Sequence, residues 1–163
     1  MPGESMTQVP SSLLHKIEHF CAYQDRCIAD VDQKLRSWKI LPDNIPGILK
    51  KLQDDSFIDE DRFARLFVRG KFHINKWGRI KIIHELRRRN IPEEMIRSAL
   101  KEIGEEDYKE MIRELIIKKK PEIPDKNSLI IREKIITFVT GKGFEYYLIE
   151  KILKELEKNN DYT

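Results

Sequence analysis

The residues best suited to recognise a partner are the lysines and arginines concentrated between positions 62 and 89. This stretch contains ten Lys and Arg residues and one acid, Glu85, so its formal charge is +9. The residues before it sum to −4 and the residues after it to −2. Charge runs commonly form a solvated helix face, and cations near a helix end also complement the helix dipole. Cations at this density beside a single acid favour instead a surface for a polyanion or an acidic partner.

Helical spacing sorts part of the basic stretch onto two faces. One group of arginines recurs at i, i+3 and i+7, and a second group, which contains a tryptophan, recurs at i, i+4, i+7 and i+11. The first group is Arg62, Arg65 and Arg69, and the second is Trp77, Lys81, His84 and Arg88. Cations around an exposed aromatic ring suit a phosphate backbone with accessible bases, or an acidic protein groove. This interpretation requires that Arg62, Lys81 and Arg88 are not held in internal ion pairs.

Other patterns that could carry chemistry are weaker. His15 and His19 stand four residues apart and could share a metal ion, but no glutamate follows His15 in the zincin manner. Cys21 and Cys27 lack the spacing of a zinc finger. The sequence has no phosphate-binding loop, dinucleotide glycine fingerprint or nucleophile elbow. We therefore expect a protein that is not an enzyme and that holds no metal or cofactor.

An internal repeat supplies the elements that position these residues. Three series of apolar residues have the same offsets of five, five, four and three, and they recur after 51 and then 53 residues. The series are Leu35, Ile40, Ile45, Leu49, Leu52, then Leu86, Ile91, Ile96, Leu100, Ile103, then Val139, Phe144, Ile149, Leu153, Leu156, each preceded four residues earlier by Val31, Ile82 or Ile135. Each series predicts a helix, a tight corner with an apolar anchor, and a second helix. An amphipathic helix precedes each pair, at residues 11–24, 59–72 and 105–119.

The repeat predicts an all-α fold of three tandem three-helix repeats, about nine helices, in an elongated array that can curve. We expect a disordered lead-in at residues 1–10, repeats at 11–55, 56–104 and 105–158, and a tail at 159–163. On the first helix of the central repeat, Phe63, Leu66 and Phe67 are expected to face inward. The expected core of that repeat comprises Phe63, Phe67, Ile83, Leu86, Ile91, Ile96 and Leu100.

The bulk composition fits a folded cytoplasmic protein. Apolar residues make up 40% of the chain and charged residues 36%. No apolar run is long enough to span a bilayer, and residues 1–10 lack the features of a secretory signal. Two cysteines are too few for a disulfide framework, so we expect free, buried thiols in a reducing cytoplasm.

Several motifs resemble those of the RecX family, and the resemblance covers the chain from about Ser11 to Leu156. The central motif resembles the signature of the middle RecX repeat and consists of Phe57-Ile58-Asp59-Glu60-Asp61-Arg62-Phe63-Ala64, Arg69, Trp77-Gly78-Arg79-Ile80, Glu85-Leu86, Ile91 and Ala99-Leu100. Residues 23–27, leading to Leu35, are similar to the first repeat of the family, and residues 143–153 to the third. Asn90 stands where the family usually has glycine before the corner isoleucine, and asparagine tolerates the same left-handed turn.

The resemblance implies a monomeric regulator that lodges in the groove of the RecA–single-stranded DNA filament. Such a protein modulates, and mainly inhibits, RecA ATPase, strand exchange and co-protease activity in homologous recombination, DNA repair and the SOS response. Binding to single-stranded and also to double-stranded DNA is a family trait, and no membrane is involved. The residues expected to contact RecA or DNA are Arg62, Arg65, Arg69, Lys71, Lys76, Trp77, Arg79, Lys81, Arg87 and Arg88. The alternatives are a free-standing helical DNA-binding protein that acts without RecA, and a purely structural helical adaptor.

Overall fold

A computed structural model describes residues 9–159 of the protein. Over that range the chain forms helices joined by turns and short loops, and it contains no strand. The predicted all-α class is confirmed. The α-helices are α1 (Ser11–Tyr23), α2 (Ile28–Ser37), α3 (Ile45–Asp54), α4 (Glu60–His73), α5 (Arg79–Arg88), α6 (Glu93–Leu100), α7 (Glu105–Lys119), α8 (Ser128–Gly141) and α9 (Tyr146–Lys158), with short 3₁₀ helices η1 (Pro42–Asn44) and η2 (Lys120–Glu122). Most of the predicted lead-in and tail, at residues 1–8 and 160–163, lies outside the described range.

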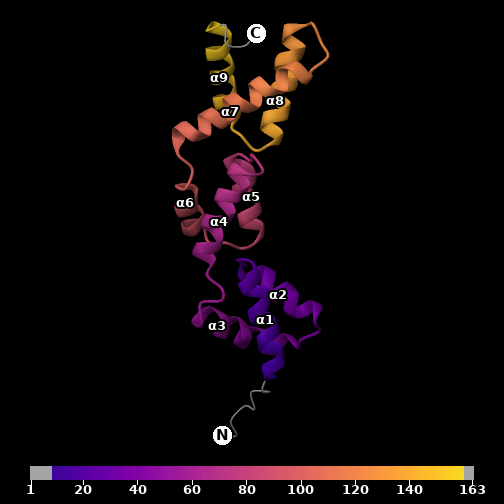
Figure 1. Ribbon diagram of the computed structural model, residues 1–163, viewed down its shortest axis with the longest axis vertical. Helices are drawn as coiled ribbons and strands as arrows, with labels where there is room; N and C mark the ends of the chain where they lie inside the picture. The colour runs from indigo at the N-terminus through magenta and orange to yellow at the C-terminus, as the bar shows by residue number, and fades with distance from the viewer. Residues whose placement is uncertain (1–8, 160–163) are drawn as a thin grey trace.

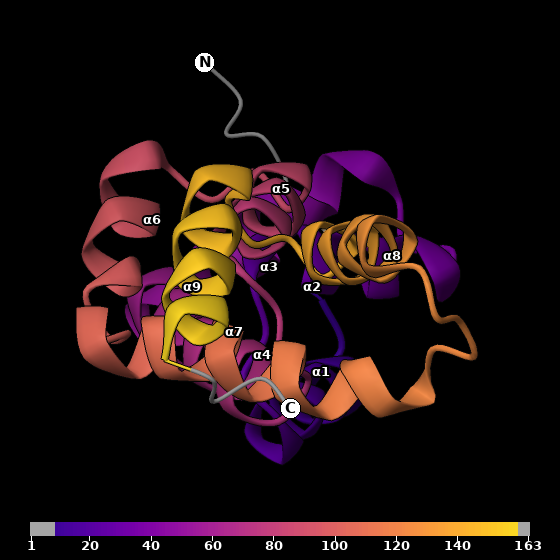
Figure 2. The same cartoon turned by 90° about the horizontal axis from the view of Figure 1, so that it is seen from above.

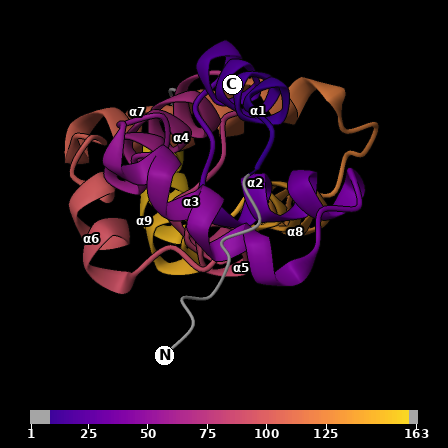
Figure 3. The same ribbon diagram turned by 90° about the horizontal axis from the view of Figure 1, so that it is seen from below.

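The helices form three groups stacked along one long axis, as Figure 1 shows. We call α1–α3 module 1, α4–α6 module 2 and α7–α9 module 3. Views along the axis from above and from below place module 3 at one end and module 1 at the other (Figures 2 and 3). The predicted elongated array of three-helix repeats is therefore confirmed.

The same left-handed turn closes the corner between the second and third helix of every module. The turn residues are Lys39 (φ 60°), Asn90 (φ 58°) and Gly143 (φ 96°). The next residue in each case is a predicted apolar anchor, and it donates its N–H to the carbonyl five residues earlier at 3.2, 3.1 and 3.5 Å. This bond gives a carbonyl of the last helical turn a second donor, as is usual where a helix ends at a left-handed residue. The repeat seen in the sequence thus corresponds to a repeated backbone geometry.

The apolar core is divided between the modules unequally. Module 1 has its own cluster, which includes Ile17, Val31 and Leu35. Modules 2 and 3 share one continuous cluster that runs from Phe63 through Tyr108 to Leu156. Because burial of apolar surface is the main favourable term in packing, modules 2 and 3 behave as one hydrophobic body to which module 1 is attached.

The prediction that Leu66 faces inward is wrong, because its side chain is 43% exposed. The inward stripe of α4 follows Ala64, Val68 and Phe72, which are all buried at intervals of four. Leu66 is two residues from Ala64, which is about 200° around a helix with 3.6 residues per turn. Phe67 packs against the core while remaining partly exposed.

Modules 2 and 3 dock through a close approach of two glycines. The N–H of Gly78 donates to the carbonyl of Lys142 at 2.8 Å, and the N–H of Ile80 donates to the carbonyl of Gly143 at 3.0 Å. A Cβ atom on Gly78 would lie 2.3 Å from the backbone of Gly143, so no larger residue fits there. These bonds satisfy N–H groups at the start of α5, which has no side-chain cap of its own.

Tyr108 completes the same junction. Its hydroxyl accepts a hydrogen bond from the N–H of Arg79 at 3.0 Å and donates one to the carboxylate of Glu145. The side chain is fully buried, and its ring contacts those of Phe72 and Phe144. Burial, followed by the bond to Glu145, raises the pKa of Tyr108 far above its usual range, so the hydroxyl stays protonated as a donor.

Modules 1 and 2 dock at the equivalent place. Cys27 stands 51 residues before Gly78, is fully buried, and belongs to the core cluster of modules 2 and 3. The N–H of the next residue, Ile28, donates to the carboxylate of Glu60 at 3.1 Å. Arg62 forms an ion pair with Asp25 across the junction. The start of the second helix therefore contacts the next module at both junctions, and an ion pair crosses each of them, Arg62–Asp25 at the first and Arg79–Glu105 at the second.

Candidate polyanion-binding surface

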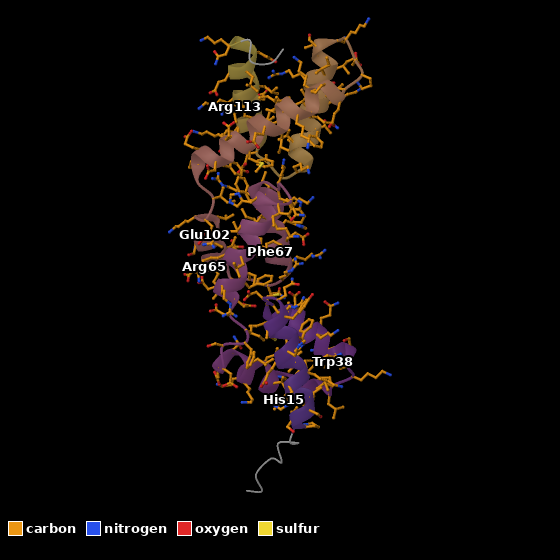
Figure 4. All side chains as sticks on the ribbon, viewed as in Figure 1. His15, Trp38, Arg65, Phe67, Glu102 and Arg113 are labelled. Carbon is orange, nitrogen blue, oxygen red and sulfur yellow. The ribbon has the colours of Figure 1, made fainter. Side chains whose placement is uncertain are left out.

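The six arginines expected at the binding surface are all engaged in ion pairs, and they do not form one face. The pairs are Arg62–Asp25, Arg65–Asp61 (3.0 Å), Arg69–Glu102 (2.7 Å), Arg79–Glu105 (2.6 Å), Arg87–Glu93 (2.6 Å) and Arg88–Glu85 (3.7 Å). Figure 4 shows Arg65 and Glu102 along one edge of module 2, on the α6 side. These carboxylates reduce the net charge that the arginines offer to a partner.

The three residues on which the sequence interpretation depends have different surroundings. Arg62 is held at the junction between modules 1 and 2 by Asp25. Arg88 is 68% exposed, and its ion pair with Glu85 is long at 3.7 Å, so the side chain stays available at the surface. Lys81 pairs with no carboxylate among residues 9–159. The charge available to a partner is therefore concentrated on the lysines of the basic stretch more than on its arginines.

Trp77 and two of these lysines form one cluster. Trp77 lies in the loop before α5 and not on the helix, and it is partly buried against the core, so the expected exposed tryptophan on a helix is corrected. The backbone N–H of Trp77 bonds the carbonyl of Lys71 at 2.9 Å, which folds the loop back onto α4. The Nζ atoms of Lys71 and Lys81 then lie 4.7 and 4.4 Å from the indole centroid. Lysine ammonium groups at this distance are attracted by the ring face.

The cluster extends toward module 1 through residues that the sequence interpretation did not place at the surface. Phe67 has two cations over its ring, Lys71 at 5.4 Å and Arg89 at 5.2 Å. Across a groove of about 530 Å³ stands Phe20 of α1. Its ring also carries two cations, Arg26 at 4.0 Å and Lys34 at 5.3 Å, and Lys34 lies 5.6 Å from the ring of Trp38.

The cluster extends toward module 3 as well. The backbone and Cβ of Lys81 lie against Gly143, whose neighbour Lys142 is 5.7 Å from the ring of Phe138. Lys119 lies over the same ring at 4.6 Å. A smaller groove of about 250 Å³ joins these residues to Lys76, the third lysine predicted at the surface.

Together these residues form a chain of alternating rings and cations across all three modules, which we call the aromatic–cation stripe. Its members are Phe20, Arg26, Lys34, Trp38, Phe67, Lys71, Trp77, Lys81, Arg89, Lys119, Phe138 and Lys142. Lys71, Trp77 and Lys81 are the only predicted contact residues in the stripe. Three pairs at i, i+4 spacing, Lys34–Trp38, Phe67–Lys71 and Phe138–Lys142, could be read from the sequence. The contacts that link these pairs to one another join residues far apart in the sequence, and spacing along one helix does not reveal them. The concentration of phenylalanine and tryptophan near lysine in several helices was the one available signal.

The remaining reactive groups are isolated. Cys21 and Cys27 are free and buried. Burial raises the pKa of the Cys21 thiol to about 11 and that of Cys27 to about 12. His15 and His19 line a shallow hollow at the free end of module 1, near Trp38. Within residues 9–159 no group of three or more His, Cys, Asp or Glu side chains could hold a metal ion. No described helix is long and apolar enough to cross a membrane.

Comparisons with known proteins agree on one family. Residues 59–100 match the family model for the second three-helix domain of RecX. The chain is 29% identical over 154 residues to the regulatory protein RecX of Bacillus cytotoxicus, covering 94% of this chain and 57% of that one. It is 29% identical over 136 residues to the regulatory protein RecX of Clostridium acetobutylicum, covering 81% and 63%. The chain thus spans little more than half the length of these curated relatives.

The fold agrees with solved structures of the same name. A crystal structure of regulatory protein RecX superimposes with a TM-score of 0.81 at 25% identity, over 88% of this chain and 72% of that one. RecX from Lactobacillus salivarius superimposes with a TM-score of 0.79 at 26% identity, over 90% and 96%. The central motif, the relatives along most of the chain and the shared three-module fold converge, so the chain is similar in sequence and in fold to the RecX family of regulatory proteins.

Proposed function

We propose that this protein regulates a RecA recombinase by binding the RecA–single-stranded DNA filament through the aromatic–cation stripe. In this role it lowers the rate of RecA ATP hydrolysis, and with it strand exchange and co-protease activity. The protein acts by binding, without catalytic residues, metal or cofactor. Its free thiols and its partner suit the cytoplasm.

The observation that carries the proposal is the stripe itself. Its rings and cations cross three modules stacked end to end, so one molecule can contact several repeating units of a helical filament. Lysines on aromatic faces suit a partner that offers both phosphates and unpaired bases. A negatively charged filament groove offers both.

The direct test is ATP hydrolysis by the cognate RecA on single-stranded DNA, with and without this protein. The wild-type protein should slow hydrolysis. The double charge reversal Lys71→Glu with Lys81→Glu should raise the concentration for half-maximal slowing by at least about tenfold, since two charge-assisted contacts become repulsive. The matched control reverses two exposed lysines on α9, Lys151→Glu with Lys154→Glu, and should behave like the wild type.

Two outcomes would contradict the proposal. If saturating wild-type protein leaves ATP hydrolysis unchanged while it still binds DNA, the chain is a DNA-binding protein that acts without RecA. If both double variants slow hydrolysis as well as the wild type, the stripe is not the contact surface.

A salt titration measures the electrostatic part of DNA binding. Contacts from about five cations to single-stranded DNA predict a slope near −3.5 for log affinity against log salt. A slope near zero would place the contacts on protein instead of DNA.

A further inference from the structure

The groove of about 530 Å³ between modules 1 and 2, which we call the intermodule groove, has an aromatic ring from each module in its lining. These are Phe20 of α1 and Phe67 of α4, and both side chains are partly exposed. The volume lies within the range of about 300–1,000 Å³ typical of small-molecule sites. The groove is therefore large enough to take a planar group the size of one base.

The charged groups of the groove are mostly cationic. Arg26, Lys34, Lys71 and Arg89 line it together with one acid, Asp30. Asp30 is 3.9 Å from Arg89, which is also bonded by Glu85. Arg26, Lys34 and Lys71 pair with no carboxylate among the described residues 9–159. A ligand of this groove should therefore carry negative charge.

The positions of the cations favour a ligand that is also planar. The Cζ atom of Arg26 lies over the Phe20 ring at 4.0 Å from its centroid, and a guanidinium is itself a flat group on which a second planar group can stack. Gln24 and Gln33 line the same groove and add amide donors and acceptors of the kind that read base edges. An acidic peptide would pair with the cations, but its carboxylates would not stack on the planar side chains.

We propose that the intermodule groove is a subsite for one unstacked base of a single-stranded nucleic acid. The base stacks on Arg26, which covers the Phe20 ring, and lies against Phe67, while Lys34 and Lys71 hold the phosphates on either side of it. This subsite deepens the proposed function, on which it rests, by assigning a base contact to the junction where modules 1 and 2 meet. A bound base would contact both modules at once.

The test uses the purified full chain and no recombinase, so its result is independent of any effect on RecA. Fluorescence anisotropy compares binding to a labelled thymidine oligonucleotide with binding to an abasic oligonucleotide of the same length, which keeps every phosphate. The abasic strand should bind at least about fivefold more weakly, which is the lower end of what stacking one base contributes. Equal affinity for the two strands would overturn the proposal without any variant.

Two variants place the base contact within the protein. Arg26→Lys keeps the charge and removes the planar guanidinium, so it should weaken thymidine binding at least about twofold and leave abasic binding unchanged. Lys154→Gln, on the exposed surface of α9, is the control and should change neither affinity. An equal loss for both strands in Arg26→Lys would show a charge contact only. A preference for bases that persists in Arg26→Lys and disappears in Trp77→Leu would place the base at Trp77 and overturn the groove proposal.

Discussion

Replacing Gly143 by alanine should destabilise the junction between modules 2 and 3. Gly143 has a φ of 96°, which side-chain-bearing residues rarely adopt, and a Cβ there would lie 2.4 Å from the Cβ of Lys81 and 2.7 Å from its backbone nitrogen. The left-handed backbone costs about 1–2 kcal/mol, and forced movement of packed atoms costs about 1–3 kcal/mol. The free energy of unfolding should therefore fall by about 2–5 kcal/mol, a large part of the about 5–15 kcal/mol of a typical domain.

The assay is urea unfolding followed by far-ultraviolet circular dichroism, with Gly141→Ala as the matched control. Gly141 ends α8 two residues earlier, and a Cβ there would have no neighbour within 4 Å outside its own helix. The control should be neutral or more stable by about 0.5–1 kcal/mol, because alanine has the higher helix propensity. If Gly143→Ala unfolds within about 1 kcal/mol of the wild type, which is the effect of an ordinary point substitution, the close approach does not constrain the junction as we infer.

Three further outcomes are expected. Lys71→Gln with Lys81→Gln should make the salt slope of single-stranded DNA binding less steep by about 1.4, because two of the contributing cations are lost, and an unchanged slope would remove them from the interface. Cys21 and Cys27 should resist a thiol reagent at pH 8 in the folded protein and react in urea, because burial raises their pKa values to about 11 and about 12; rapid labelling of Cys27 without urea would show that the first junction is open. The bond from Arg89 lowers the pKa of Glu85 below its ordinary 4.5, so its stabilisation is present above that value and is lost as the pH falls through the lowered pKa. The melting temperature of Glu85→Gln should accordingly fall less than that of the wild type on acidification, and equal falls would contradict this assignment.

The repeat could be read from the sequence because the features that define it are local. In each module the second helix, the corner and its apolar anchor are close together in the sequence. The left-handed turns at Lys39, Asn90 and Gly143 recur at the spacing of the repeat. The helix predicted at 105–119 has the observed bounds, the one predicted at 11–24 extends one residue too far, and the one predicted at 59–72 is displaced by one residue at both ends. Local patterns of this kind depend on periodicity and turn chemistry, which a single sequence contains.

The candidate surface was harder to predict because its contacts join distant segments. Arg69 donates a hydrogen bond to Glu102, which is 33 residues away in the sequence, and Phe20 and Phe67 line the same groove. A net charge counted along the chain takes no account of such pairings, so it overstated the role of the arginines. Trp77 was assigned to a helix face by its spacing alone, although the bond from its N–H to Lys71 holds it in a loop. Tertiary contacts decided both cases.

The two junctions should differ in how strongly salt weakens them. The second junction combines glycine backbone bonds and a shared apolar core, neither of which depends strongly on dissolved ions, with the ion pair Arg79–Glu105. The first relies more on Arg62–Asp25 and Arg89–Asp30, whose attraction weakens within a Debye length of about 8 Å at physiological ionic strength. Rising salt should thus loosen the contact of module 1 with module 2 while modules 2 and 3 stay packed together. The length and bend of the protein would then depend on ionic strength, which also sets its affinity for a polyanion.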